Sequence, residues 1–479
     1  MRGELLINVT PQETRVAVIE NGMLQELHTE RSRTRGLVGQ IYMGRVLRVL
    51  PGMQAAFVDI GLERSAFIHE RNLRGDSSVP ISSRLHEGQA LRVQVEKDPI
   101  GDKGARLTAQ ISLPARYLVF MPDADHVGVS ARIEDETERE RLRERVQTLG
   151  EGMGGFVVRT AADGVSDDEL EQDIKYLKKA WSKIQTGTAA TGDVPRLLHQ
   201  ELPLALRACR DLIQADTEVV RIDSAETFRA AQAFCEVAEP EVLGKLQWYP
   251  GERPLFDLYS VEEEIRRALE RRVDLKSGGY LVIDQTEAMT TIDVNTGAFV
   301  GQRNLEETIF KTNLEAANSL PRQLRLRGLA GIIIVDFIDM RDAEHRDAVL
   351  RTLESALRKD PMRHRVSGIS PLGLVEISRK RVRESLGGQL CEPCITCGGR
   401  GRIRTAETVA YDLFRDVLRE SRAYLETKSM LVLAHPRVIE FILEHEPDQL
   451  ADLEAFIKRS IRLQEAPEYT PEQYEVVPC

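Results

Sequence analysis

Apolar residues between positions 280 and 340 fall into three short runs, and two of these runs end at or near an acid. The runs are Leu281–Ile283, Met289–Asn295 and Ile332–Val335. Short runs rich in β-branched residues are typical of buried strands, and none of these is long enough to span a membrane. The pattern therefore predicts neighbouring strands of a buried sheet, with Asp293 closing one strand and Asp336 lying near the end of another.

The first 35 residues are expected to form three strands, with a hairpin at Asn21-Gly22. Such a piece is too small to build a core of its own. Residues 216–279 contain a further strand and helices, so we expect the two segments to form one domain, interrupted by an inserted barrel and a helical unit. Strand–helix alternation after residue 280 indicates an α/β class, and the residues after 405 are expected to form a last small α/β unit.

Residues 39–113 show short strands separated by regular turn signals, which is typical of a small barrel. Within them, residues 44–69 resemble the S1 domain, an OB-type RNA-binding barrel. Phe57 and Phe67 match the exposed aromatic positions of that domain, where a ring stacks a base for roughly 1–3 kcal/mol. Lys103 lies in a glycine-rich turn that could meet a phosphate. The competing interpretation is that both rings are core residues, as most phenylalanines in strands are.

From residue 117 to about residue 215 the periodicity is mainly helical. Residues 134–149 are densely charged, with apolar positions at helical spacing, which predicts an amphipathic helix with one solvated face. Residues 154–160 are expected to form a strand ending in Arg159-Thr160, and a capping box at Ser166 starts the next helix. Residues 194–208 are expected to continue the helical character.

Charge narrows the class of protein. The net charge of −11 argues mildly against a protein that coats nucleic acid through bulk charge, but it leaves room for local basic grooves. One stretch is rich in cations, and these are Arg363, Arg365, Arg379, Lys380, Arg381, Arg383, Arg400, Arg402 and Arg404. This stretch is either a phosphate-binding patch or a solvated face. The N-terminus lacks the apolar core of a signal peptide and no stretch approaches a spanning helix, so we expect a cytoplasmic protein.

Three of the six cysteines lie within seven residues, at Cys391, Cys394 and Cys397. Disulfide frameworks belong to small secreted chains, so this spacing in a long chain points to a metal instead. A structural zinc needs four ligands. Either Cys391 and a distant histidine complete the site, or two chains contribute two cysteines each across a two-fold axis, which predicts a homodimer. Free thiols are the remaining alternative, and Cys209 and Cys235 are expected in the core.

Asp293 and Asn295 are two positions apart, so on a strand their side chains point to one face. Mg²⁺ prefers one or two carboxylates and keeps several waters, which the pair Asp293 and Asp336 would allow. A bound water with a lowered pKa, directed at phosphorus, hydrolyses a phosphodiester. Asn295 cannot be a base, but it can orient Asp336 or donate to the phosphate. The competing interpretation is that these strand-end acids are turn formers or helix caps.

Five motifs carry a resemblance that covers nearly the whole chain. They are the S1 stretch, FVVRTA, TIDVNTG, IIIVDFIDM and CITCGGRG. Jointly they resemble the catalytic half of the ribonuclease E/G family, and the chain is expected to lack the long disordered C-terminal half of some members. The resemblance implies a multidomain α/β fold. Its parts are a discontinuous RNase H-like domain (1–35 and 216–279), an S1 barrel (36–118), a 5′-sensor region (119–215), a DNase I-like catalytic subdomain (280–390), a zinc link (391–404) and a small C-terminal α/β domain (405–479).

The resemblance implies a Mg²⁺-dependent endoribonuclease that cuts single-stranded, A/U-rich RNA and favours 5′-monophosphorylated ends. Implied substrates are ribosomal RNA precursors, notably the 5′ end of the small-subunit RNA, and messenger RNA. By position, Asp293 and Asp336 match the Mg²⁺ ligands, and Asn295 matches a catalytic hydrogen-bonding partner. Cys394 and Cys397 match a zinc motif shared between the subunits of a homodimer or tetramer.

Two further groups of residues match binding positions of the family. Arg159, Thr160, Arg132 and the backbone near Val119 match the pocket that senses a 5′-monophosphate, and Phe57, Phe67 and Lys103 match the RNA contacts of the barrel. Where the family has two adjacent arginines, this chain has Ala131-Arg132. A planar guanidinium and a hydroxyl suit a terminal monophosphate, whereas a bulkier triphosphate would fit poorly.

Two other functions compete with this one. The chain could be a non-catalytic RNA-binding or ribosome-assembly factor that uses the barrel and the basic stretch, or an RNase H that acts on RNA–DNA hybrids. The presence of Asp293, Asn295 and Asp336 together favours the endoribonuclease.

Overall fold

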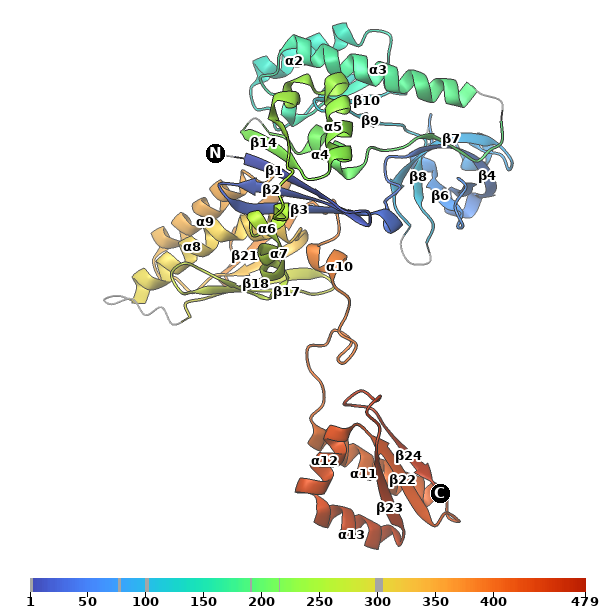
Figure 1. The fold of residues 1–479 in the computed structure, drawn as a ribbon, viewed down its shortest axis with the longest axis vertical. Helices are drawn as coiled ribbons and strands as arrows, with labels where there is room; N and C mark the ends of the chain where they lie inside the picture. The colour runs from blue at the N-terminus through green and yellow to red at the C-terminus, as the bar shows by residue number, and fades with distance from the viewer. Residues whose placement is uncertain (1–2, 76–78, 100–102, 190–191, 215, 298–304) are drawn as a thin grey trace. The chain divides into compact units, whose positions relative to one another are not determined.

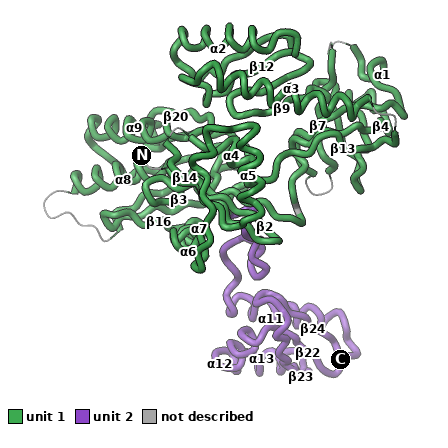
Figure 2. Tube along the Cα trace, turned by 45° about the horizontal axis from the view of Figure 1, so that its top comes forward, with its two compact units in different colours: residues 1–386 green, residues 387–479 purple. Residues whose placement is uncertain are grey.

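The computed structural model describes residues 3–75, 79–99, 103–189, 192–214, 216–297 and 305–479. The chain divides into two compact units, Met1–Leu386 and Gly387–Cys479 (Figure 2). Within the described ranges, the larger unit holds four sheets and the smaller unit holds one (Figure 1). No helix in these ranges is long and apolar enough to cross a membrane.

The N-terminal strands belong to a five-stranded sheet with the order β15-β14-β1-β2-β3. Its strands are β1 (Gly3–Val9), β2 (Glu13–Glu20), β3 (Met23–Arg31), β14 (Thr217–Ile222) and β15 (Leu246–Trp248). Asn21 and Gly22 have positive φ angles of 50° and 77°, and β2 pairs with β3 around them, so the predicted hairpin is confirmed. β1 pairs in parallel with β14, so the first strands share a sheet with strands that come far later in the chain.

Two helices pack on this sheet, α4 (Leu204–Asp211) and α5 (Ala225–Ala238). Cys209 and Cys235 are buried in the core that they form with the sheet, as predicted. Two short helices follow, α6 (Leu255–Leu258) and α7 (Val261–Leu269).

Five strands close into a barrel, because β4 pairs with β5 on one side and with β7 on the other. Around the barrel they are β4 (Ile41–Leu50), β5 (Ala55–Asp59), β6 (Ala66–His69), β8 (Arg106–Thr108) and β7 (Ala90–Lys97), with α1 (Ile81–Arg84) between β6 and β7 in the chain. Aliphatic side chains such as Val46, Val58 and Leu107 form its core. The predicted small barrel is therefore confirmed.

The helix expected over residues 194–208 is wrong for the first half of that range. Residues Arg196–His199 form β13, which pairs antiparallel with β4, and α4 begins only at Leu204. Pro195 precedes the strand and Pro203 is the N-cap of α4. Proline lacks a backbone N–H and its ring clashes with the preceding helical turn, so a helix begins after Pro203 rather than running through it.

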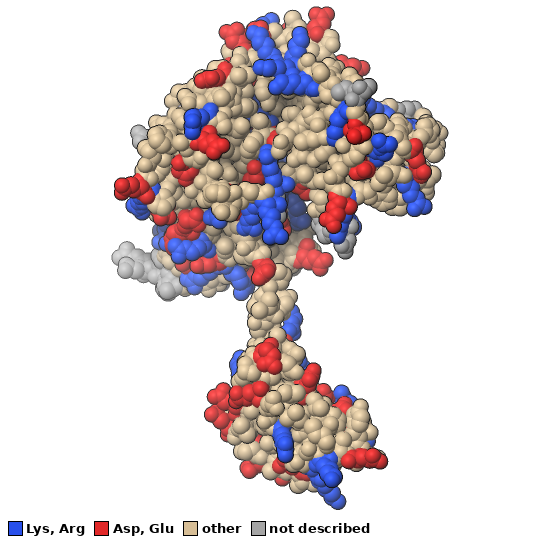
Figure 3. Space-filling model, turned by 45° about the vertical axis from the view of Figure 1, so that its right-hand side comes forward, with Lys and Arg blue, Asp and Glu red and all other residues tan. Residues whose placement is uncertain are grey.

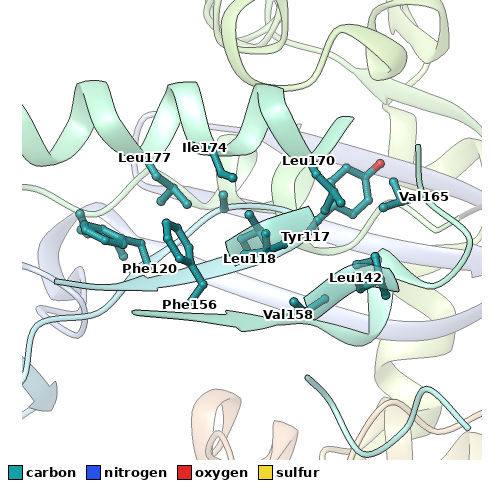
Figure 4. Close-up of a cluster of buried hydrophobic side chains, with 14 of the residues drawn as sticks. Tyr117, Leu118, Phe120, Leu142, Phe156, Val158, Val165, Leu170, Ile174 and Leu177 are labelled. Carbon is teal, nitrogen blue, oxygen red and sulfur yellow. The ribbon is translucent and has the colours of Figure 1, made fainter. Parts of the chain in front are cut away.

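A four-stranded sheet with the order β11-β12-β10-β9 follows the barrel. Its strands are β9 (Leu113–Pro114), β10 (Leu118–Met121), β11 (Val127–Val129) and β12 (Gly155–Val158), and its helices are α2 (Glu136–Leu149) and α3 (Asp167–Ala189). Figure 4 shows Phe120 and Phe156 facing Leu177 and Ile174 of α3. One face of this sheet is therefore sealed by helices, and its strand ends carry the residues predicted to sense an RNA end.

The acidic strands lie inside a six-stranded sheet with the order β16-β17-β18-β19-β21-β20. The strands are β16 (Arg272–Asp274), β17 (Tyr280–Gln285), β18 (Met289–Asn295), β19 (Gly331–Asp336), β20 (His364–Ile369) and β21 (Leu374–Arg379). The helices α8 (Leu305–Leu326) and α9 (Ala343–Leu357) contribute to its core and lie next to each other (Figure 1). The predicted neighbouring strands are confirmed, since β18 pairs antiparallel with β17 and parallel with β19.

The smaller unit begins within a short helix, α10 (Leu386–Leu390), and contains a three-stranded sheet with helices. Its sheet has the order β23-β22-β24, with β22 (Ser429–Ala434), β23 (Ser460–Glu465) and β24 (Tyr474–Pro478). The helices are α11 (Ala406–Ala423), α12 (Pro436–His445) and α13 (Pro447–Ile457). This is the small C-terminal α/β unit that the sequence predicts.

Candidate active site

The two predicted catalytic acids are direct neighbours on adjacent parallel strands. Asp293 on β18 is in register with Asp336 at the end of β19, and neighbouring strands lie about 4.8 Å apart. The residues next to each acid, such as Ile292 and Val335, are buried in the core beneath the sheet. Because side chains alternate along a strand, both carboxylates point to the opposite, exposed face.

Asn295 is held against the first of these acids. Its side-chain Nδ2 donates a hydrogen bond of 2.9 Å to Oδ2 of Asp293. The sequence places Asn295 on the same face as Asp293 but suggests that it orients Asp336 or meets a phosphate. In the structure it orients Asp293 instead, which leaves Asp336 without an amide partner among the described residues.

A third acid, Asp339, contributes to the electrostatics of this edge. Partial burial and the neighbouring charges of Asp293 and Asp339 raise the pKa of Asp336 above its ordinary value. No lysine or arginine in the described part of the chain forms an ion pair with these three residues. We call Asp293, Asp336 and Asp339 the acidic edge. Its unbalanced negative charge and its oxygen ligands suit a hard divalent cation such as Mg²⁺.

The loop that carries Asp339 is fixed by a buried asparagine. Asn313 on α8 is fully buried, donates from Nδ2 to the carbonyl of Ile338 at 2.8 Å and accepts the N–H of Ile338 at 3.1 Å. The sequence singles out neither Asn313 nor Asp339. An acid three positions after Asp336 is a visible signal for Asp339, whereas the role of Asn313 depends on a contact between distant segments.

The aromatic residues of the barrel lie on its outer surface. Phe57 and Phe67 are cross-strand partners on β5 and β6, with ring centroids 6.1 Å apart and an edge-to-face angle of 68°. Both are partly exposed, and neither belongs to the barrel core. The interpretation of both rings as core residues is therefore wrong. Lys103 is exposed, while Gly101 and Asp102 of its predicted turn lie outside the described residues.

Two arginines extend this aromatic pair across the barrel. Arg48 on β4 is in register with Phe57, and Arg106 on β8 is in register with Phe67. We call Arg48, Phe57, Phe67 and Arg106 the aromatic row. The sequence does not reveal it, because a register shift between Val46 and Arg48 changes which residues are neighbours.

The residues predicted to sense an RNA end gather where β11 and β12 end. The hydroxyl oxygens of Thr160 and Ser130 are 2.9 Å apart, and Arg132 lies two residues beyond Ser130. Val119 on β10 is the cross-strand partner of Val157, two residues before Arg159. We call Arg132, Arg159, Thr160 and Val119 the end-sensing region.

Both arginines of the end-sensing region already have partners within the chain. Nη1 of Arg159 donates to the carbonyl of Ala115 at 2.6 Å and to Oδ1 of Asp211 at 2.8 Å. Nη1 of Arg132 donates to the carbonyl of Pro361, next to the six-stranded sheet. A phosphate at this site would therefore meet cations that are already held in place.

The cysteine motif forms a compact turn. The N–H of Gly401 donates to Sγ of Cys397 at 3.3 Å, and N–H groups of Cys397 and Thr396 lower the pKa of the Cys394 thiol. Thiolates held in this way suit zinc. Cys391 is exposed, and within the described ranges no three histidine, cysteine or acidic residues lie together as a metal site requires. The described chain thus provides no support for a zinc site completed by Cys391 and a distant histidine.

The basic stretch expected over residues 363–404 is not one surface. Arg379 is buried and bonds to Asp360 at 2.6 and 3.0 Å, while Arg383 donates to the carbonyl of Leu27 at 2.6 Å. Arg404 in the other unit pairs with Glu472. On the face in Figure 3, basic side chains form separate patches among acidic ones. Arg379 and Arg383 are structural residues, which corrects their assignment to a phosphate-binding patch.

Comparison with known proteins gives matches over the whole chain. Residues 112–382 match the model of the ribonuclease E/G family, and residues 393–478 match that of the RNase E/G thioredoxin-like domain. The chain is 52% identical to a ribonuclease G of Salmonella typhimurium over 492 residues, with 100% of both proteins covered. It is 49% identical to a ribonuclease G of Haemophilus influenzae, with 99% of both covered. It is 39% identical to a ribonuclease E of Escherichia coli, over 87% of this chain and 40% of that protein.

Proposed function

Because the chain belongs to the ribonuclease E/G family, we propose that it is an endoribonuclease that hydrolyses phosphodiester bonds in single-stranded, A/U-rich RNA with Mg²⁺. The observation that carries the proposal is the acidic edge, where Asp293 and Asp336 are in register on an exposed face without a cation from the described chain. Two neighbouring carboxylates of this kind are what a Mg²⁺ ion at a phosphodiester site requires.

The residues of the acidic edge have distinct tasks in this proposal. Asp293 and Asp336 hold the metal ion, and Asn295 fixes the orientation of Asp293 through its 2.9 Å hydrogen bond. Asn313 fixes the loop at Ile338, so that the charge of Asp339 adds to the attraction for the cation. When bound, Mg²⁺ lowers the pKa of a water and offsets charge on the phosphate.

RNA is delivered by the barrel and checked by the end-sensing region. The two rings of the aromatic row stack bases, while Arg48, Arg106 and Lys103 meet the backbone. Arg159, Thr160 and Arg132 bind a 5′-monophosphate in a pocket bordered by the backbone near Val119. This proposal assigns the domains the roles expected from the sequence. They are an RNase H-like domain, an S1 barrel, a 5′-sensor and a DNase I-like catalytic subdomain, with the boundaries given in the sequence analysis.

The processing of ribosomal RNA 5′ ends and the decay of messenger RNA are the proposed roles, in the cytoplasm. The direct test compares a 5′-monophosphorylated single-stranded RNA with an RNA–DNA hybrid, each with and without Mg²⁺. We expect the single strand to be cut with Mg²⁺ and the hybrid to be spared. Faster cleavage of the hybrid would identify an RNase H, and binding of RNA without any cleavage would identify a binding factor.

Zinc shared between two subunits is a second part of the proposal. Cys394 and Cys397 supply two ligands, so two chains together supply the four that a structural zinc needs. We expect about one zinc ion per two chains, a homodimer or a tetramer built from dimers, and loss of both metal and dimer in Cys394→Ser/Cys397→Ser. Cys391→Ser is the matched control and should keep both. Metal analysis and analytical ultracentrifugation measure these outcomes, and a double variant that stays dimeric would contradict the shared site.

A further inference from the structure

Asp211 lies at the end of α4, outside every motif that carries the family resemblance, yet its carboxylate reaches Arg159. Its Oδ1 accepts from Nη1 of Arg159 at 2.8 Å. Its Oδ2 accepts from Nη2 of Arg210 at 2.9 Å. Asp211 is thus clamped between two arginines, one of which belongs to the end-sensing region.

The second arginine is itself immobilised. Arg210 is 6% exposed and donates from Nη1 to Oε1 of Glu201 at 3.0 Å. Burial alone would raise the pKa of Asp211, but the guanidinium charges of Arg210 and Arg159 outweigh it and hold that pKa below its ordinary value. The carboxylate is therefore ionised and fixed from behind, so it can hold a second cation in a defined place.

The contacts of Arg159 leave one edge of its guanidinium open. The side-chain hydrogen bonds of Arg159 to Ala115 and Asp211 both use Nη1. In the described part of the chain, Nε and Nη2 have no hydrogen-bond partner. A guanidinium binds a phosphate best through two parallel N–H groups on one edge, and Nε with Nη2 forms such an edge.

The position of Asp211 is not explained by the helix that carries it. Asp211 is the last residue of α4, where the helix dipole disfavours a negative charge. An acid at this place therefore costs the helix stability unless the charge serves another contact. The contacts in the structure are Arg210, on the same helix, and Arg159 of the end-sensing region.

We propose that Asp211 is a positioning residue for the 5′ end: it holds Arg159 by Nη1 so that the Nε–Nη2 edge faces a terminal monophosphate. This inference rests on the proposed sensing of 5′-monophosphates. Without Asp211, Arg159 keeps only its hydrogen bond to the carbonyl of Ala115. Its guanidinium can then turn toward internal phosphates as well, so the enzyme loses discrimination between RNA ends rather than general activity.

The test measures a ratio within each variant. Cleavage of 5′-monophosphorylated and 5′-hydroxyl forms of one RNA gives the ratio of kcat/KM, for the wild type, Arg159→Gln, Asp211→Asn and Asp211→Ala. We expect Asp211→Ala to lower the ratio at least about fivefold, toward that of Arg159→Gln. Asp211→Asn keeps an acceptor oxygen and should fall between. Asp163→Asn is the matched control, because this exposed acid lies three residues after Thr160 and has no side-chain partner in the described part of the chain.

A second readout separates this inference from the proposed catalysis. Fluorescence anisotropy with 3′-labelled oligonucleotides, without divalent cation, gives the same end preference from binding alone. If the wild type cuts no RNA, the endoribonuclease proposal fails while the binding ratio still tests Asp211. An unchanged ratio in Asp211→Ala, or an equal loss on both RNAs, overturns the inference and leaves a merely structural residue. An unchanged ratio in Arg159→Gln overturns the sensor and the inference together.

Discussion

The end-sensing region and the acidic edge handle charge in opposite ways. Arg159 is paired with Asp211 at 2.8 Å, and Asp211 is in turn paired with Arg210. At the acidic edge, Asp336 faces the like charges of Asp293 and Asp339, and its pKa is raised. A charge matched within the chain is held in place before any ligand arrives, whereas an unmatched cluster is completed only by a cation. Under the proposed function, RNA ends are checked by a preformed site and cut by one that a metal completes.

Removing the unmatched acids gives the largest expected effect. Asp293→Asn and Asp336→Asn keep the shape of each side chain and remove one ligand charge. We expect each to lower kcat for single-stranded RNA by about 100-fold or more, since positioned charge at a reacting phosphate is worth that much. Cleavage assays over a range of Mg²⁺ concentrations measure the loss.

The control for these variants is Asp347→Asn. Asp347 is an exposed acid on α9, which packs beneath the sheet, so its charge lies on the side away from the acidic edge. The Asp347→Asn variant should cleave RNA as fast as the wild type does. Full activity in Asp293→Asn would show that the acidic edge is not the catalytic centre and that its unmatched charge has another cause.

The aromatic row extends the comparison between paired and unpaired charges, because it combines two uncharged rings with an arginine that already has an acidic partner. Arg106 pairs with Glu96 at 3.1 Å. We expect Phe57→Ala or Phe67→Ala to weaken RNA binding about 5- to 150-fold with little change in salt dependence, in line with stacking energies of about 1–3 kcal/mol. Arg106→Ala should weaken binding less, because in the wild type Arg106 must break its ion pair with Glu96 before it can bind a phosphate. This variant should also lower the slope of log K against log salt concentration by about 1.

Binding titrations at several salt concentrations separate these contributions. Phe456→Ala is a suitable control, since this ring is 70% exposed but lies in the smaller unit. If the phenylalanine variants bind RNA as tightly as the wild type, the aromatic row does not stack bases.

Which parts of the site the sequence could reveal depends on how far apart the contacting residues lie in the chain. Alternation of apolar and polar positions predicted that Asp293 and Asn295 share a face, and strand ends predicted the place of Asp336. The pairing of Arg48 with Phe57 depends on a bulge, and that of Arg159 with Asp211 joins segments 52 residues apart. Neither leaves a periodic signal in the sequence.

The failed helix over residues 194–208 has a related physical cause. Apolar spacing alone took no account of Pro195 and Pro203, which both disfavour a continuous helix. It also could not reveal that β13 pairs with a strand far earlier in the chain. Likewise, the prediction of a phosphate-binding patch over the basic stretch was wrong for Arg379. The sequence shows the charge of an arginine but not its burial, and Arg379 forms an ion pair with Asp360 inside the protein. The local pattern of apolar and polar residues thus predicted most of the helices and strands, whereas long-range contacts determined the roles of individual side chains.

The smallest predicted effect tests whether charges near the end-sensing region are really matched. Arg116 follows Ala115, whose carbonyl accepts from Arg159, and it faces Glu239 at 3.4 Å and Glu241 at 3.7 Å, with Asp173 nearby. Burial and the charge of Asp173 outweigh the attraction of Arg116 and raise the pKa of Glu239 to about 9. Burial likewise raises the pKa of Asp173 to about 7, against the N–H groups of Tyr117 and Leu118. The single positive charge of Arg116 is therefore too small to keep all the neighbouring acids ionised.

This crowding makes stability depend on pH in a defined direction. In the unfolded chain Glu239 loses its proton near pH 4.5, but in the folded chain it keeps the proton to about pH 9. The folded state therefore binds more protons, and stability falls as pH rises through this window. Glu239→Gln removes the proton linkage, so it should match the wild type near about pH 5 and melt about 2–4 °C higher near about pH 8.5. Thermal unfolding at both pH values, with the exposed Glu236→Gln on α5 as control, decides the point. Equal destabilisation of Glu239→Gln at both pH values would mean that Glu239 is ionised and matched by Arg116, and the contrast with the acidic edge would then extend through the whole base of the end-sensing region.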